Sequence, residues 1–152
     1  CNDAVEAVQR LFDLGVHANS IAAEVLAIIA QRLAMRICDG CREEVAPDAA
    51  ILGELREPPG ELRCWAGRGC QRCGGRGTYG RVAAIEYLPV GPEMRRAISR
   101  QLPLDDLRHV ALSSGLVTMR DSALALVASG TIPLADLPRI LPAERMAPER
   151  AG

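Results

Sequence analysis

The sequence predicts a mainly α-helical protein with a small β component and a cysteine-rich, metal-binding segment inserted between its helical parts. Apolar residues recur at helical spacing over much of the chain, and one stretch rich in Val, Ile and Tyr is typical of a strand. Four of the six cysteines form two C-x-x-C pairs, and metal binding is favoured over a disulfide framework because nothing marks the chain as secreted. The 152 residues suit one domain or two small ones.

Residues 1–37 predict two helices. The first has Asn2 and Asp3 as favourable caps and Gly15 as a stop, with apolar residues between them at helical spacing: Val5, Val8, Leu11 and Phe12. The second is longer, begins near Asn19 and Ser20, and ends at residues 36–37. Its residues 21–33 form a wide apolar stripe, so we expect this helix to be buried on most of its circumference.

Residues 38–81 are rich in glycine and proline and too poor in large apolar groups to close a core alone. The pairs Cys38-x-x-Cys41 and Cys70-x-x-Cys73 enclose 28 residues, and this spacing lets one turn of backbone present two thiolates to one ion. Four thiolates in a tetrahedron form the closed type of structural zinc site, which has no open position for water or substrate. We therefore predict Cys38, Cys41, Cys70 and Cys73 as ligands of a structural Zn²⁺.

Two other interpretations of the cysteine pairs are weaker. A thioredoxin-like redox site needs one C-x-x-C at a helix start within a βαβ unit, and a disulfide framework fits a secreted chain. Cys64 could replace one ligand but is more simply a spare thiol, and Cys1 has no nearby partner. Gly40 and Gly74 are expected to supply the positive φ angles that such turns often require.

Beyond the cysteines, residues 82–90 read as a strand, which we expect to pair outside the 38–81 segment. Pro92 opens a helix, and a second helix ends at Gly115. A third helix starts at a Thr118-x-x-Asp121 capping box, and Pro133 opens a short last helix. The tail has almost nothing to bury and is expected to be flexible. The predicted organisation is thus 1–37 helical, 38–81 zinc module, 82–91 strand, 92–141 helical lobe and 142–152 flexible tail.

The charged residues exclude several functions. The chain has 18 basic residues, all arginine, against 19 acidic ones, so it contains neither a Schiff-base lysine nor a G-x-x-x-x-G-K-[ST] phosphate loop. Residues 38–81 hold seven arginines and seven acidic residues, and four thiolates with one Zn²⁺ add −2. Nucleic acid is therefore not an expected partner, although the run from Arg63 to Arg81 is locally positive.

No residue is predicted to be catalytic or to bind a cofactor other than the metal. The two histidines and the paired acidic residues have no ligands or partners at suitable spacing and read as solvated groups. The most apolar stretch is too short and too polar to span a membrane. Since the first residue is Cys1 and no signal sequence precedes it, we expect a fragment; a lipoprotein, which also begins with Cys, is the weaker alternative.

An ordered set of motifs over residues 2–141 resembles one family. The motifs are Asn2-Asp3-Ala4, Leu14-Gly15-Val16, Ala30-Gln31-Arg32-Leu33, the two cysteine pairs with Gly69 to Gly77, Gly80-Arg81, Glu86 with Leu88, and Gly115 to Asp121. This order is similar to the C-terminal part of the traffic ATPases of type II secretion and type IV pilus assembly, the GspE and PilB group. The chain departs from that pattern at Val82-Ala83, where the family usually has Thr-Gly, and at Ser122, where it has Gly.

The resemblance implies a cytoplasmic, hexameric ATPase that uses ATP and Mg²⁺ to drive pilus or pseudopilus assembly and protein export, held at the inner membrane by platform proteins. Residues 1–37 would be the last helices of its RecA-like P-loop core, and residues 82–91 a strand returning to that core. The family's phosphate-binding loop would precede Cys1, so the chain alone is expected to be inactive. The alternative is a zinc adaptor of a nucleic-acid-binding protein or of a DnaJ-type chaperone. Zinc modules of the DnaJ type carry a C-x-x-C-x-G-x-G unit, and the residues from Cys70 to Gly77 match it.

Overall fold

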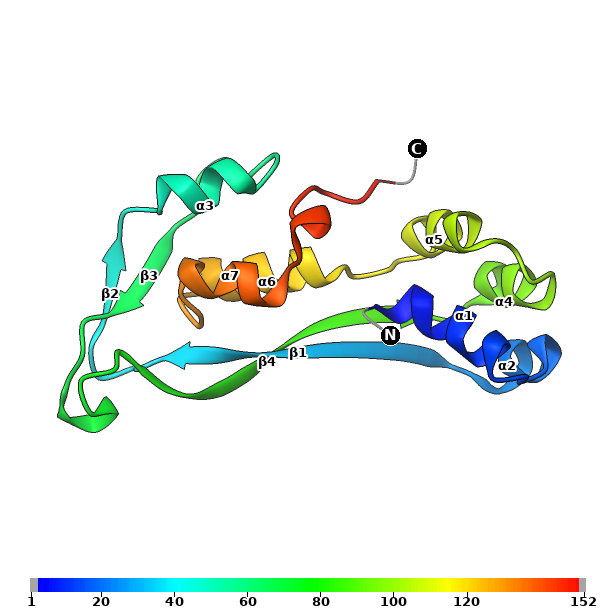
Figure 1. Ribbon diagram of the computed structural model, residues 1–152, viewed down its shortest axis with the longest axis horizontal. Coiled ribbons are helices and arrows are strands. Elements are labelled where there is room, and N and C mark those ends of the chain that lie inside the picture. The colour runs from blue at the N-terminus through cyan, green and yellow to red at the C-terminus, as the bar shows by residue number, and fades with distance from the viewer. Residues whose placement is uncertain (1–2, 151–152) are drawn as a thin grey trace. The chain divides into compact units, whose positions relative to one another are not determined.

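A computed structural model of the chain describes residues 3–150, which divide into two compact units. Of these residues, unit 1 comprises 3–30, 85–119 and 149–150, and unit 2 comprises 31–84 and 120–148. The strands β1 (Ala27–Ile37) and β4 (Thr78–Pro89) pair with each other, and each contributes residues to both units (Figure 1). This confirms the prediction that the strand after the cysteines pairs outside the 38–81 segment.

Unit 1 contains four helices: α1 (Ala4–Asp13), α2 (Ala18–Glu24), α4 (Pro92–Ser99) and α5 (Leu104–Ser113). Helix α2 packs on α4, and α5 contacts both α4 and α1 (Figure 1). Their shared core is aliphatic and includes Val5, Val8, Ile21, Leu88, Met94, Ile98 and Leu107. The predicted helices at residues 5–12, after Pro92 and before Gly115 are confirmed. Asp3 caps α1, because its Oδ1 accepts a hydrogen bond from the Glu6 N–H; Asn2 lies outside the described residues.

A buried carboxylate in unit 1 caps the starts of two helices. The Glu86 side chain is 1% exposed; its Oε1 accepts a hydrogen bond from the Ala4 N–H at 2.7 Å, and its Oε2 accepts one from the Met119 N–H at 3.1 Å. Ala4 is the first residue of α1 and Met119 the first of α6 (Met119–Ala128). The first N–H groups of a helix lack partners within it and carry partial positive charge, so an anion there is favourable.

Unit 2 contains the short strands β2 (Arg42–Val45) and β3 (Cys64–Gly67), the helix α3 (Ala49–Glu54) between them, and the 3-10 turn η1 (Gln71–Cys73). It also contains most of α6, the turns η2 (Leu134–Asp136) and η3 (Ala143–Arg145), and the helix α7 (Leu137–Ile140). β2 and β3 form an antiparallel ribbon, with Arg42 opposite Gly67 and Val45 opposite Cys64. Helix α3 thus lies between the two cysteine pairs.

Two side chains join the parts of unit 2. Arg120 is buried and donates hydrogen bonds to the carbonyls of Arg56 and Glu57, and a third from its Nε to the Met146 carbonyl. Trp65 lies on β3 with the guanidinium groups of Arg42 and Arg63 over its ring, their central carbons 5.3 and 5.2 Å from the ring centre. Gly130 approaches the same ring so closely that a Cβ there would lie 2.9 Å from it.

The prediction of one helix from residue 19 to residue 37 is wrong. Helix α2 ends at Glu24, and residues 27–37 form the strand β1. Exposure along β1 alternates: Ile29 and Leu33 are 62% and 58% exposed, whereas Ala34 is buried. A short apolar run fits both helical and strand periodicity, and here the β-branched pair Ile28-Ile29 and the available partner β4 favour the strand. The fold is therefore a mixed α/β one, with a larger β component than predicted.

The prediction that the tail buries almost nothing is wrong for residues 142–150. Met146 is 3% exposed, and its carbonyl accepts the hydrogen bond from Arg120. Glu149 forms an ion pair with Arg108 in unit 1, at 3.0 Å. Tertiary contacts with two arginines far away in the sequence therefore order a segment whose composition favours disorder.

No helix among residues 3–150 is long and apolar enough to cross a membrane.

Replacing Glu86 by alanine should lower the free energy of unfolding by about 2–4 kcal/mol, since it removes a charged acceptor and leaves buried N–H groups of Ala4 and Met119 unpaired. Equilibrium urea unfolding measures the change. The exposed Glu93, in the first turn of α4, is the matched control, and its alanine variant should change stability by less than about 1 kcal/mol. Equal effects of the two substitutions would contradict the capping role of Glu86.

Candidate metal centre

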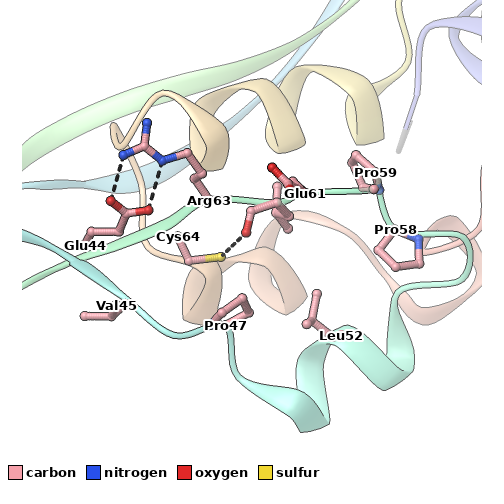
Figure 2. A pocket seen from close by; sticks show the side chains of 11 residues that line it. Glu44, Val45, Pro47, Leu52, Pro58, Pro59, Glu61, Arg63 and Cys64 are labelled. Carbon is pink, nitrogen blue, oxygen red and sulfur yellow. Dashed lines mark hydrogen bonds and ion pairs between the residues drawn. The ribbon is translucent and has the colours of Figure 1, made fainter.

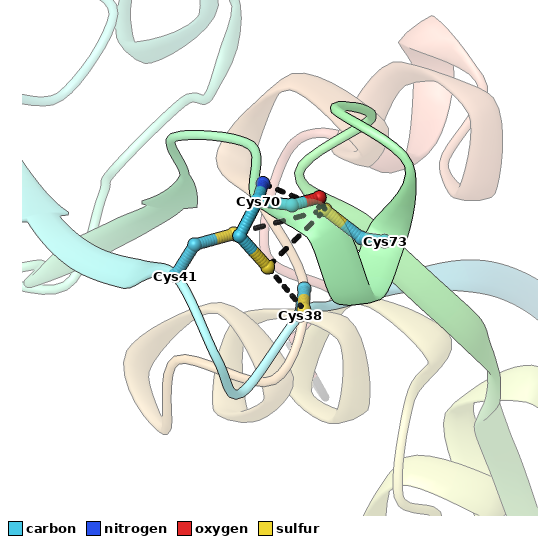
Figure 3. Close-up of side chains that lie close together, drawn as sticks. All are labelled: Cys38, Cys41, Cys70 and Cys73. Carbon is cyan, nitrogen blue, oxygen red and sulfur yellow. Dashed lines mark hydrogen bonds between the residues drawn. The ribbon is translucent and has the colours of Figure 1, made fainter.

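Two turns of unit 2 bring the four predicted cysteines together (Figure 3). Cys38 follows β1 directly and Cys41 precedes β2, with the Cys41 N–H donating to the Cys38 carbonyl. Cys70 and Cys73 bracket the single turn η1. Cys38, Cys41 and Cys73 are buried, and Cys70 is partly buried. The structure thus places all four predicted metal-binding residues in one cluster.

The sulfur atoms have the spacing of a tetrahedral metal site. Cys38 Sγ lies 3.8 Å from Cys70 Sγ, Cys41 Sγ 3.9 Å from Cys73 Sγ, and Cys70 Sγ 3.8 Å from Cys73 Sγ. All four sulfurs lie within 4.8 Å of one another. A tetrahedron with metal–sulfur bonds of about 2.3 Å has sulfur–sulfur edges of about 3.8 Å, so the donor set fits one ion of that type.

Backbone N–H groups point at two of the sulfurs. The Gly69 N–H donates to Cys41 Sγ at 3.3 Å, and the N–H groups of Cys70 and Gly77 each donate to Cys73 Sγ at 3.2 Å. The Cys70 N–H, with that of Gly77, lowers the pKa of Cys73 to about 6, while burial raises the pKa of Cys41 to about 11. The site therefore favours negative charge at Cys73, and a bound cation would favour the thiolate form of all four cysteines.

Two glycines allow the chain to close around the sulfurs. The backbones of Gly67 and Gly77 lie so close that a Cβ on either would clash with the carbonyl of the other. Gly74 has a φ of 63°, as predicted. The same prediction is wrong for Gly40, which lacks a positive φ, and a Cβ there would meet Cys70 Sγ at 3.5 Å, an ordinary van der Waals contact.

Cys64 does not join the cluster. Cys64 lies on β3, is 1% exposed, and its Sγ is 3.7 Å from the Leu62 carbonyl; burial raises its pKa. This agrees with a spare thiol and not with a substitute ligand. Cys1 lies outside the described residues. The sequence predicted the four cysteines that cluster, but it missed the Gly69 and Gly77 N–H donors, whose only signal is the glycine run around the second pair.

The chain belongs to the type II/IV secretion system protein family, which matches residues 1–139. Among its relatives, the type IV pilus assembly ATPase PilB of Thermus thermophilus is 35% identical over 139 residues, covering 90% of this chain and 16% of that protein. The type II secretion system protein HxcR of Pseudomonas aeruginosa is 34% identical, with coverages of 91% and 26%. The type II secretion system protein E of Klebsiella pneumoniae is 36% identical over 99 residues, covering 65% of this chain and 20% of the relative. The chain thus spans about a quarter or less of their length.

Replacing any one of Cys38, Cys41, Cys70 or Cys73 by serine should lower the bound metal from one equivalent to well below half, because a three-thiolate site loses both charge and closure. Elemental analysis of chain purified with added Zn²⁺ measures this. Cys64→Ser is the matched control and should retain one equivalent, since its sulfur lies outside the cluster. Full metal content in the four variants, or loss in the control, would refute this ligand set.

Proposed function

We propose that this chain is the C-terminal part of a motor ATPase of type II secretion or type IV pilus assembly. The family match over residues 1–139 carries the proposal, and relatives named as a pilus assembly ATPase and as secretion proteins support it. The whole protein would be a cytoplasmic hexamer that hydrolyses ATP with Mg²⁺ and drives pilus or pseudopilus assembly and protein export. Contacts with platform proteins would hold it at the inner membrane.

Within that motor this chain would have a structural role. Its 152 residues include no lysine, so a lysine-bearing phosphate loop would have to come from outside them. A closed four-thiolate centre leaves no position for substrate, which argues against metal catalysis. Residues 1–37 and 82–91 would complete the RecA-like core, residues 38–81 would form the zinc module, and residues 92–141 a helical lobe.

The metal would be Zn²⁺ held by Cys38, Cys41, Cys70 and Cys73. Soft thiolates in a tetrahedron suit zinc, which has no redox chemistry and supplies only a fixed crosslink. Residues 38–81 need such a crosslink, because β2 and β3 have four residues each and α3 has no buried residue. Metal binding on the order of 10 kcal/mol would then also be the folding energy of this segment.

Removing the metal should unfold residues 38–81 selectively. Hydrogen exchange followed by mass spectrometry, on zinc-loaded chain with and without a chelator, measures this: amides of β2 and β3 should lose protection by about a hundredfold or more. Helices α4 and α5 serve as the internal control and should keep their protection, since the aliphatic core of unit 1 stabilises them. Unchanged exchange in β2 and β3 would contradict a metal-dependent fold.

The isolated chain should not hydrolyse ATP, whereas the complete protein should. Steady-state phosphate release, measured on both at equal concentration, tests this directly. In the complete protein, the double variant Cys41→Ser with Cys73→Ser should lower turnover and secretion or piliation by about tenfold or more, as expected when a module unfolds. Cys64→Ser should leave both unchanged. ATP turnover by the isolated chain, or none by the complete protein, would refute the proposal.

A further inference from the structure

An apolar groove opens in unit 2 between the β2–β3 ribbon and the connection that carries α3 (Figure 2). Its volume is about 380 Å³, within the range of about 300–1,000 Å³ of small binding sites. Aliphatic and proline side chains dominate its lining: Val45, Pro47, Leu52, Pro58, Pro59 and Leu62. Val45, Leu52 and Leu62 are only half-buried, so the groove leaves apolar surface open to water that a partner could cover.

The wall of this groove is rigid before any partner binds. Pro58 and Pro59 fix the backbone, and Glu57 just before them has a φ of 51°, a conformation that costs energy for a residue with a Cβ. The buried Arg120 holds this conformation by donating hydrogen bonds to the carbonyls of Arg56 and Glu57, at 2.8 and 2.9 Å. These contacts within unit 2 hold the wall of the groove in one conformation.

The net charge around the groove is negative. Residues 43–61 contain six acidic residues and one basic residue, but Glu43 pairs with Arg68 and Glu44 with Arg63, so the balance with those two arginines is six acidic to three basic residues. Arg63 also lines the groove, but Glu44 pairs with both its Nε and its Nη2, at 2.9 and 2.7 Å, and neutralises it (Figure 2). Glu61 is exposed on the lining itself. An apolar floor with an acidic surround repels nucleic acid and anionic lipid and attracts a cationic chain.

We propose that this groove binds a short, basic, amphipathic segment of a partner protein. Leu- or Val-sized side chains of that segment would fill the space beside Leu52 and Leu62, and its arginines or lysines would meet Glu61 and the neighbouring acidic residues. This docking site goes beyond the proposed function, which assigns the cysteine cluster and leaves the groove without a role.

The test uses zinc-loaded, ¹⁵N-labelled full chain and two synthetic helical peptides. One peptide has leucines on one face and arginines on the other, and the second has glutamates in place of the arginines. The basic peptide should bind at least about tenfold more tightly, with amide shifts centred on residues 45–62. Leu52→Ala should weaken it about tenfold, and Glu61→Lys about threefold.

Glu144→Lys, which makes the same charge change on the exposed turn η3 outside the groove lining, is the matched control and should alter affinity by less than about twofold. The surface variant Glu61→Lys keeps the test decisive even if Leu52→Ala loosens α3. Equal binding of both peptides, an equal effect of the two lysine variants, shifts outside residues 45–62, or no binding up to about 1 mM would each overturn the proposal.

Discussion

Four sulfur atoms from two turns that are 32 residues apart in the sequence lie within 4.8 Å of one another, and this approach closes the cysteine-rich segment into a loop. Between the turns lie two four-residue strands and one short helix, which together bury Leu55 and Cys64 but build no core of their own. Closing such a loop costs conformational entropy that these few contacts do not offset. A crosslink through an ion, as proposed for these four cysteines, would offset that cost for the ribbon and for the groove beside it.

Unit 1 is stabilised in a different way. Its helices share an aliphatic core, and its buried carboxylates are paired: Glu86 with the starts of two helices, and Asp3 with Arg108 at 2.7 Å. Removing one member of such a pair leaves a buried group without its partner, which costs more than the pair itself contributes. Loss of the proposed metal should therefore affect the cysteine-rich segment of unit 2, whereas unit 1 depends on its core and its buried carboxylates.

The sequence was sufficient for features that local spacing determines. The C-x-x-C pairs predicted the sulfur cluster, and caps and stops such as Asp3 and Pro92 predicted helices that the structure confirms. It failed where a distant partner decides the outcome. Residues 27–37 form a strand because β4 pairs with them, and Met146 is ordered because Arg120 reaches its carbonyl. The groove has the same origin, since its wall depends on a hydrogen bond between residues 63 positions apart. No local pattern records such contacts.

The single tryptophan of the chain lies where two arginines cover its ring, on the β3 strand of the ribbon and against Gly130. Its fluorescence consequently belongs to unit 2 alone and contains no signal from unit 1. The two cations and the packed glycine give the ring an environment that exists only while the ribbon is formed. Tryptophan emission is thus a built-in, label-free reporter of the ribbon in unit 2, and a melting curve recorded with it describes that unit rather than the chain as a whole.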